Sequence, residues 1–480
     1  MDRIILFPGR FTIIVVFIVF VFNSQEQLHA QNVWTLEACI RHAHEKNINV
    51  RQQELGVEIA GENLTRATLE RFPNLNMNAT HGYNYGRTID PFTNEFATER
   101  VRSNNFSVSS GVVLFNGFQI NNAVKQSRLE LDASKHDVDA TKNDISLAIS
   151  SAYLDILLSE ELVEVLEGQL EVTRQQVERT KKFVEAGTVP RGNLLTIEAQ
   201  AASEELQLIN AQNRLQMAYI NLAQLLDLRE IEDFAIHIPE IEISPDEMID
   251  MSPFEIYEIA VNIQPDIKAS EIRVLSAEKD VEIARGGRYP TLSLRGSYGT
   301  GYSGASREIV DETLVERQIG WTESDELVYG YDVDFQTQIK PFIDQLEDNL
   351  NTSIGFYLTI PVFNNYQTSS AISRSKVALE NSKLSNRLVR DQLFKSIQQS
   401  HADAKAALKR YEATKKNYGA LEESFRYTEQ RFNVGMADPI EYNDAKNRLA
   451  AAESELLQAK YEFVFRTKIL DFYMGNPITL

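Results

Sequence analysis

The sequence consists of two halves that repeat one another at almost constant spacing. Motifs of the first half recur 248 residues later, and one earlier motif recurs 217 residues later. The matched pairs are Phe115-Asn116-Gly117 with Phe363-Asn364-Asn365, Glu185-Ala186-Gly187-Thr188 with Asn433-Val434-Gly435-Met436, and Arg71-Phe72-Pro73 with Arg288-Tyr289-Pro290. The offset changes only once, by 31 residues, between Leu292 and Phe363. Constant spacing is expected of units of fixed length, so the chain is predicted to contain two copies of one elongated unit.

Each half contains a long segment that favours helix. No proline occurs between Pro91 and Pro190 or between Pro361 and Pro439, and glycine is scarce in 118–185 and 366–434. Apolar residues recur every seven positions in both segments and in the segments that follow, a pattern typical of coiled-coil packing. A helix over 118–185 would be about 100 Å long at 1.5 Å per residue. We therefore predict a long antiparallel helical hairpin in each half.

Glycine and proline mark the reversal of each predicted hairpin. A glycine just past a helix adopts the left-handed conformation easily, and a proline shortly after it cannot continue the helix. The predicted hairpin tips, which a partner protein would contact, are Gly187, Thr188 and Pro190 in the first half and Gly435, Met436, Asp438 and Pro439 in the second.

Four segments alternate between apolar and small polar residues with a period of two. One pair follows Pro73 and Pro290, and the other pair precedes Phe115 and Phe363. Strands of about ten residues with this pattern are typical of membrane β-barrels, although a soluble sheet packed on one face is the alternative. Four strands cannot close a barrel, and open edges cannot lie in lipid, so several chains must share the barrel.

Loops 87–103 and 303–350 join the strands of each pair, and the second holds the 31-residue insertion. Long loops of outer-membrane barrels lie outside the cell. We expect 303–350, which carries twelve acids and three bases, to be an extended extracellular loop. It is either a solvated surface loop or a lid over the pore mouth.

The N-terminal segment has the features of an export signal. Arg3 and Arg10 flank an apolar run over 11–22, which is shorter than the roughly 20 residues that a membrane-spanning helix needs. We expect cleavage after Ala30, with a retained membrane anchor as the alternative. The predicted division is a signal peptide (1–30), a first structural repeat (31–228), an equatorial linker (229–253) and a second structural repeat (254–480).

Composition and motifs argue against several functions. The chain carries 48 basic and 69 acidic residues, a net charge of −21, so no nucleic-acid partner is expected. The single cysteine, Cys39, excludes an intrachain disulfide. His42 and His44 lie two apart in a helical segment and therefore face different ways. No catalytic, cofactor or metal site is predicted, and the protein is not expected to be an enzyme.

Together, the signal, the duplicated unit and the turns resemble the TolC family of outer-membrane efflux proteins. The most specific matches are Val184-Glu185-Ala186-Gly187 and Asn433-Val434-Gly435 with the residues after them. The resemblance implies a homotrimer in the outer membrane, in which helical hairpins form an α-barrel across the periplasm. Each chain contributes four transmembrane strands to a 12-stranded β-barrel. The implied partners are outer-membrane lipid, a periplasmic adaptor (membrane fusion) protein and an inner-membrane pump of the RND or ABC type.

The resemblance also implies a periplasmic entrance constriction formed by Glu441, Asp444 and Phe432. Glu441 and Asp444 are three apart on a helix and would form a ring of carboxylates in a trimer, favouring cations. The alternative is two solvated surface acids. Some members lock the entrance with an aromatic residue and an arginine around the glycine; the arginine position is Ala437 here, and the first-half acid is Asn193.

These features favour a passive exit duct of a tripartite efflux or type I secretion system, energised by its partners. The alternative is a cell-envelope coiled-coil adaptor or structural protein without a pore, for which four matched amphipathic strands are not expected.

Overall fold

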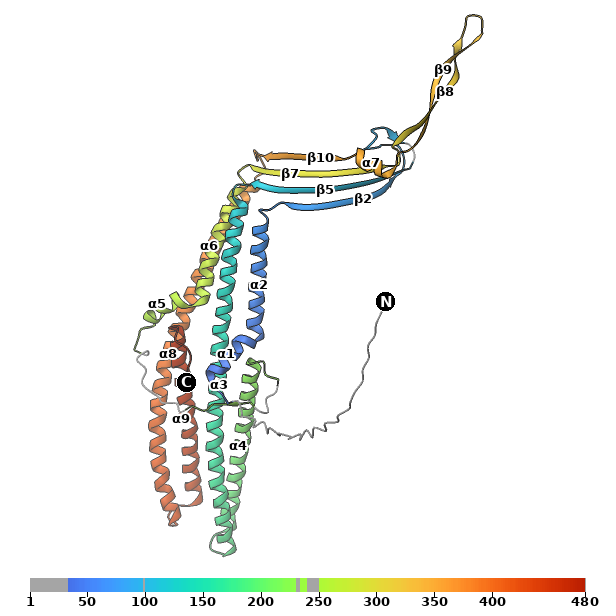
Figure 1. Cartoon of the computed structure of the whole chain (residues 1–480). Helices are drawn as coiled ribbons and strands as arrows, with labels where there is room; N and C mark the ends of the chain where they lie inside the picture. The colour runs from blue at the N-terminus through green and yellow to red at the C-terminus, as the bar shows by residue number, and fades with distance from the viewer. Residues whose placement is uncertain (1–32, 98–99, 230–233, 240–249, 480) are drawn as a thin grey trace, which may run out of the picture.

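The computed structural model describes residues 33–97, 100–229, 234–239 and 250–479. The predicted signal peptide and much of the predicted linker lie outside these residues. The molecule is elongated, with a sheet at one end and a long column of helices beneath it (Figure 1). None of the helices in the described part of the chain is long and apolar enough to cross a membrane.

Two long helical hairpins form the lower column. The helices of the first hairpin are α3 (Gln119–Glu185) and α4 (Arg191–Leu225). Those of the second are α8 (Gln367–Asn433) and α9 (Pro439–Tyr473). The lengths are 67 and 35 residues in both hairpins. This equality follows from the constant spacing of the two halves in the sequence.

Shorter helices complete the upper column. They are α1 (Leu36–Lys46), α2 (Ile48–Leu69), α5 (Pro253–Ile263) and α6 (Pro265–Gly286). The upper parts of α3 and α8 extend alongside α2 and α6 toward the sheet (Figure 1). Strands β1 (Val33–Trp34) and β6 (Ala235–Ile236) pair in parallel at the level where the upper and lower columns meet. The main apolar core lies there, with Ile149, Ile156 and Leu222 fully buried.

The four predicted strands form one antiparallel sheet. They are β2 (Asn74–Asn84), β5 (Val101–Phe115), β7 (Thr291–Ser303) and β10 (Asn351–Thr359). Their order is β10-β7-β5-β2, so β10 and β2 are its open edges. Large apolar side chains project from the edge strands and remain exposed, among them Met77 at 77% and Ile354 at 78%.

The insertion differs from the expected loop. It contains strands β8 (Arg307–Trp321) and β9 (Leu327–Ile339), which pair as a hairpin projecting beyond the sheet, and the short helix α7 (Phe342–Asp348) (Figure 1). The shorter loop contains the small pair β3 (Thr88–Ile89) and β4 (Phe96–Ala97). The insertion forms strands because β9 alternates apolar and polar residues with a period of two.

Candidate functional site

Both hairpin tips share one backbone arrangement. Gly187 and Gly435 have positive φ angles of 70° and 78°. In the first tip the amide of Gly187 bonds the carbonyl of Val184, and Thr188 bonds Phe183, both at 3.0 Å. In the second tip Gly435 bonds Phe432 at 3.0 Å and Met436 bonds Arg431 at 2.8 Å. This is the Schellman motif, which satisfies the last carbonyls of a helix and requires a residue that tolerates positive φ.

Asp438 begins the helix after the second tip. Its carboxylate accepts a hydrogen bond from the amide of Glu441 at 2.8 Å, and Pro439 occupies the first turn. Both features are typical of a helix start. Pro190, Asp438 and Pro439 thus lie at the beginning of α4 and α9, immediately after the turns.

The two predicted entrance acids each have an arginine partner. Arg431, in the last turn of α8, binds Glu441 at 2.6 Å and also donates to the carbonyl of Met436 at 3.2 Å. Asp444 binds Arg448, one turn further along α9, at 2.9 Å. All four side chains are substantially exposed, so these pairs stabilise the tip only weakly. Each arginine balances the charge of the acid that it pairs with.

Phe432 faces into a hollow of about 480 Å³ between the two hairpin tips. Its ring lies 4.6 Å from that of Tyr442, measured between centroids. Burial raises the pKa of the Tyr442 phenol to about 12, so it remains neutral. Asn193, at the position of the first-half acid, and Ala437, at the position of the latch arginine, line the same hollow. One contact that joins the two hairpins there is a hydrogen bond from Arg179 to Asn433, at 3.4 Å.

A buried ion pair joins the two hairpins further up. Lys446 of α9 lies 3.1 Å from a carboxylate oxygen of Glu204 of α4, and the two residues are only 6% and 3% exposed. Thr173 donates to Oε2 of Glu204 at 2.6 Å and also contacts the Lys446 ammonium. Gln200 donates at 2.9 Å to Oε1, the oxygen that lies 3.1 Å from Lys446. Burial lowers the pKa of Lys446, and the Glu204 carboxylate opposes that shift.

This pair was not predicted. The available signal was Glu204 itself, a charged residue in a row of otherwise apolar residues that recur every seven positions. Its counterpart in the second half is Ala452, which is buried. The copies therefore differ at a core position, and that difference places a charge between the hairpins.

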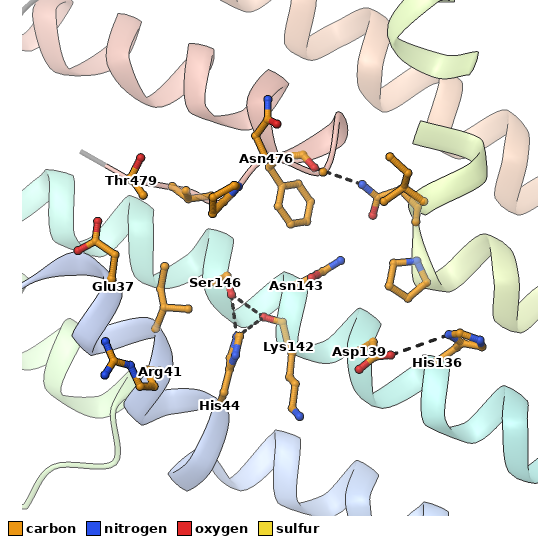
Figure 2. A pocket seen from close by; sticks show the side chains of 18 of the residues that line it. Glu37, Arg41, His44, His136, Asp139, Lys142, Asn143, Ser146, Asn476 and Thr479 are labelled. Atoms are coloured by element: carbon orange, nitrogen blue, oxygen red, sulfur yellow. Dashed lines mark hydrogen bonds and ion pairs between the residues drawn. The ribbon is translucent and has the colours of Figure 1, made fainter. Parts of the chain in front are cut away.

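A hollow of about 710 Å³ lies between α1, α3, α6 and the C-terminal segment (Figure 2). His44 points into it, and its Nε2 lies 2.8 Å from the Ser146 hydroxyl. Burial lowers the pKa of His44, which favours the neutral ring. His42 contacts Trp34 instead, at 5.0 Å between centroids. Within the described residues, no three His, Cys, Asp or Glu side chains are placed to hold a metal ion.

Comparison with known families gives one match that covers most of the chain. The model of a family described as outer membrane efflux protein matches residues 39–227 and 256–476. The outer membrane efflux protein BepC of Brucella suis biovar 1 (strain 1330) is 21% identical over 434 residues, which cover 90% of this chain and 83% of BepC.

Solved structures share the fold. The outer membrane protein VceC of Vibrio cholerae matches with a TM-score of 0.70 and 17% identity, covering 92% of this chain and 96% of VceC. The CmeC outer membrane channel of Campylobacter jejuni matches with a TM-score of 0.72 and 15% identity, covering 92% and 85%. These matches confirm the predicted combination of long helical hairpins with membrane β-strands.

Proposed function

The chain belongs to the outer membrane efflux protein family, and from this premise we propose that three copies form the exit duct of a tripartite efflux or type I secretion system. The family consists of outer-membrane channels rather than enzymes, with helices that extend into the periplasm. In the proposed assembly, substrate passes through a water-filled tunnel, while an adaptor and an inner-membrane pump supply the energy.

The four-stranded sheet is the observation that carries the proposal. Its edges are open, and its exposed face carries large apolar side chains on β2 and β10. The strands alternate in direction, so β10 of one copy and β2 of the next would pair antiparallel, as the strands within the sheet do. A closed ring satisfies the backbone groups that an open edge leaves unpaired in lipid.

The hairpin tips are proposed to contact the adaptor and to enclose the entrance. Gly187, Thr188, Pro190, Gly435, Met436, Asp438 and Pro439 form the ends of the column furthest from the sheet (Figure 1). Glu441 and Asp444 lie on the first two turns of α9, close to this end, and Phe432 lies between the tips. Three copies would place six carboxylates and their arginine partners around the opening.

Planar-bilayer recordings and mass measurement of the detergent-solubilised protein test the duct. Trimers that conduct ions are expected, whereas a monomer that is soluble without detergent would contradict the proposal and favour the adaptor alternative.

The double variant Glu441→Gln/Asp444→Asn leaves Arg431 and Arg448 unpaired, so the reversal potential in a salt gradient should shift away from cation preference. Asp391→Asn is the control, because Asp391 forms a similar exposed pair with Arg387 elsewhere on α8. Equal reversal potentials for both variants would refute the entrance assignment.

A further inference from the structure

Strand β9 of the β8–β9 hairpin carries its large apolar side chains on one face and its acids on the other. Opposite residues of an antiparallel pair lie on the same face, and so do residues two apart in a strand. The apolar row of β9 consists of Leu327, Tyr329, Tyr331, Val333, Phe335 and Ile339. On β8, Trp321 lies opposite Leu327 and Leu314 lies opposite Val333. We call these eight residues together the aromatic face. The other face, which we call the acidic face, carries Asp332 and Asp334 on β9 and Asp311 and Glu308 on β8. It also carries Arg317, which pairs with Asp332 at 3.0 Å.

This face lies open in the single chain. Tyr331 is 80% exposed and Leu314 is 70% exposed. A hairpin of two strands is marginally stable alone in water, and a row of exposed large apolar side chains such as that of β9 indicates an interaction site. The hairpin projects past the sheet without a covering helix (Figure 1). The aromatic face is therefore a surface on which a partner can pack.

Buried polar contacts hold the base of the hairpin against the sheet. Gln345 of α7 is 1% exposed; its side chain accepts from the amide of Ser303 at 2.9 Å and donates to the carbonyls of Ser303 at 3.0 Å and Lys340 at 2.9 Å. The Ser303 hydroxyl also bonds buried Asp90. The amide of Lys340 bonds the carbonyl of Ser306 at 3.0 Å. These contacts fix both strands at the end of β7, so the sheet sets the position of the hairpin.

We propose that the aromatic faces of three β8–β9 hairpins pack against one another around the axis of the assembly, forming a collar above the outer mouth. This inference rests on the proposed trimer. Three sheets in one ring hold their hairpins at equal height and at a high effective concentration. The hairpins of the other two copies are therefore the nearest surfaces that can cover the aromatic face. The distribution of charge agrees, because the acids of β9 all lie on the face that would remain in water.

Two acids of β8, Glu312 and Glu316, lie opposite Phe335 and Tyr331 and are therefore on the same side of the hairpin as the aromatic face. The odd-numbered positions of β9 from Leu327 to Phe335 carry no charge, and β9 therefore provides the contact row. With this strand nearest the axis, the carboxylates of β8 lie at the periphery of each contact.

Single cysteines test the collar. In a Cys39→Ala background, Tyr331→Cys is placed on the aromatic face and Asp332→Cys on the acidic face. Mild oxidation of the detergent-solubilised trimer should give disulfide-linked dimers on a denaturing gel for Tyr331→Cys and little for Asp332→Cys. Val333→Cys repeats the measurement on the aromatic face, in case the tyrosine substitution disturbs the hairpin.

The outcomes separate this inference from the proposed duct. Trimers in which both faces cross-link equally, or neither does, would overturn the collar and leave the duct intact. A chain that forms no trimer would overturn both. Labelling of Tyr331→Cys by a maleimide that is blocked only when lipopolysaccharide vesicles are added would also overturn the collar, because lipid would then be the occupant.

Discussion

Glu204 and Lys446 form a buried ion pair between the two repeats. Removing two charges from water is costly, and their attraction offsets that cost only when the remaining polar atoms are also paired. Here Thr173, Gln200 and the carbonyl of Gln169 supply the additional hydrogen bonds. The pair fixes the position of α9 against α3 and α4, so movement of one hairpin past the other must break it.

Removing one member of this pair should destabilise the protein strongly. Lys446→Met leaves the Glu204 carboxylate buried without its cation, a change that typically costs about 3–5 kcal/mol. The thermal unfolding midpoint of the detergent-solubilised protein should therefore fall. The double variant Glu204→Leu/Lys446→Met removes both charges and should recover most of the loss. A double variant as unstable as the single one would show that shape, rather than charge, determines this contact.

Arg431 sets the net charge next to Glu441. Arg431→Gln removes one cation from the second tip of each copy and should increase cation preference in planar bilayers, opposite in sign to the Glu441→Gln/Asp444→Asn variant. Folding should be preserved, because an exposed pair contributes only about 0.2–1 kcal/mol. Arg410→Gln is the control, since Arg410 pairs with Glu462 far from the tip. A shift of equal size in the control would assign the effect to overall charge.

At the scale of elements, the turn glycines and the helix glycines have opposite roles. Gly435 has a φ of 78°, and a side chain there would meet no neighbour but would strain the backbone. Gly419 lies inside α8, also with open space around it. Gly435→Ala should cost about 1–2 kcal/mol, because a side chain disfavours the left-handed conformation. Gly419→Ala should stabilise α8 by roughly 0.5–1 kcal/mol.

Amide hydrogen exchange of peptides around the second tip measures this difference. Exchange should become faster in Gly435→Ala and slower or unchanged in Gly419→Ala. Slower exchange in the Gly435 variant would mean that the turn does not need positive φ at that residue.

The sequence predicted these long elements well because glycine and proline bound them. The segment expected as a helix over 118–185 corresponds to α3, Gln119–Glu185. The β8–β9 hairpin escaped prediction because bulges at Val310 and Ile319 shift the register, so apolar residues of β8 do not alternate. The ion pair between Glu204 and Lys446 was not predicted for a different reason. Glu204 and Lys446 are 242 positions apart, and only the packing of the two hairpins brings them together.

At the scale of the whole molecule, the sheet and the helical column of one chain are suited to different solvents. The column exposes charged pairs such as Arg387 with Asp391, whereas β10 exposes Ile354, Phe356 and Leu358 on one side. In the proposed trimer these side chains contact lipid, and the opposite, small polar residues line water. The same alternation that makes a single chain unsuited to water makes three chains suited to a membrane.

Neighbouring residues of the edge strand β2 test this assignment of faces. Met77 belongs to the proposed lipid face and Asn78 to the proposed water-filled interior. Met77→Arg places a charge in lipid, at a cost of up to about 2–4 kcal/mol near the bilayer midplane. The amount of assembled trimer recovered from outer membranes should therefore fall. Asn78→Arg should assemble normally and instead reduce single-channel conductance to cations. Equal loss of trimer in both variants would mean that the two faces of the sheet do not meet different solvents.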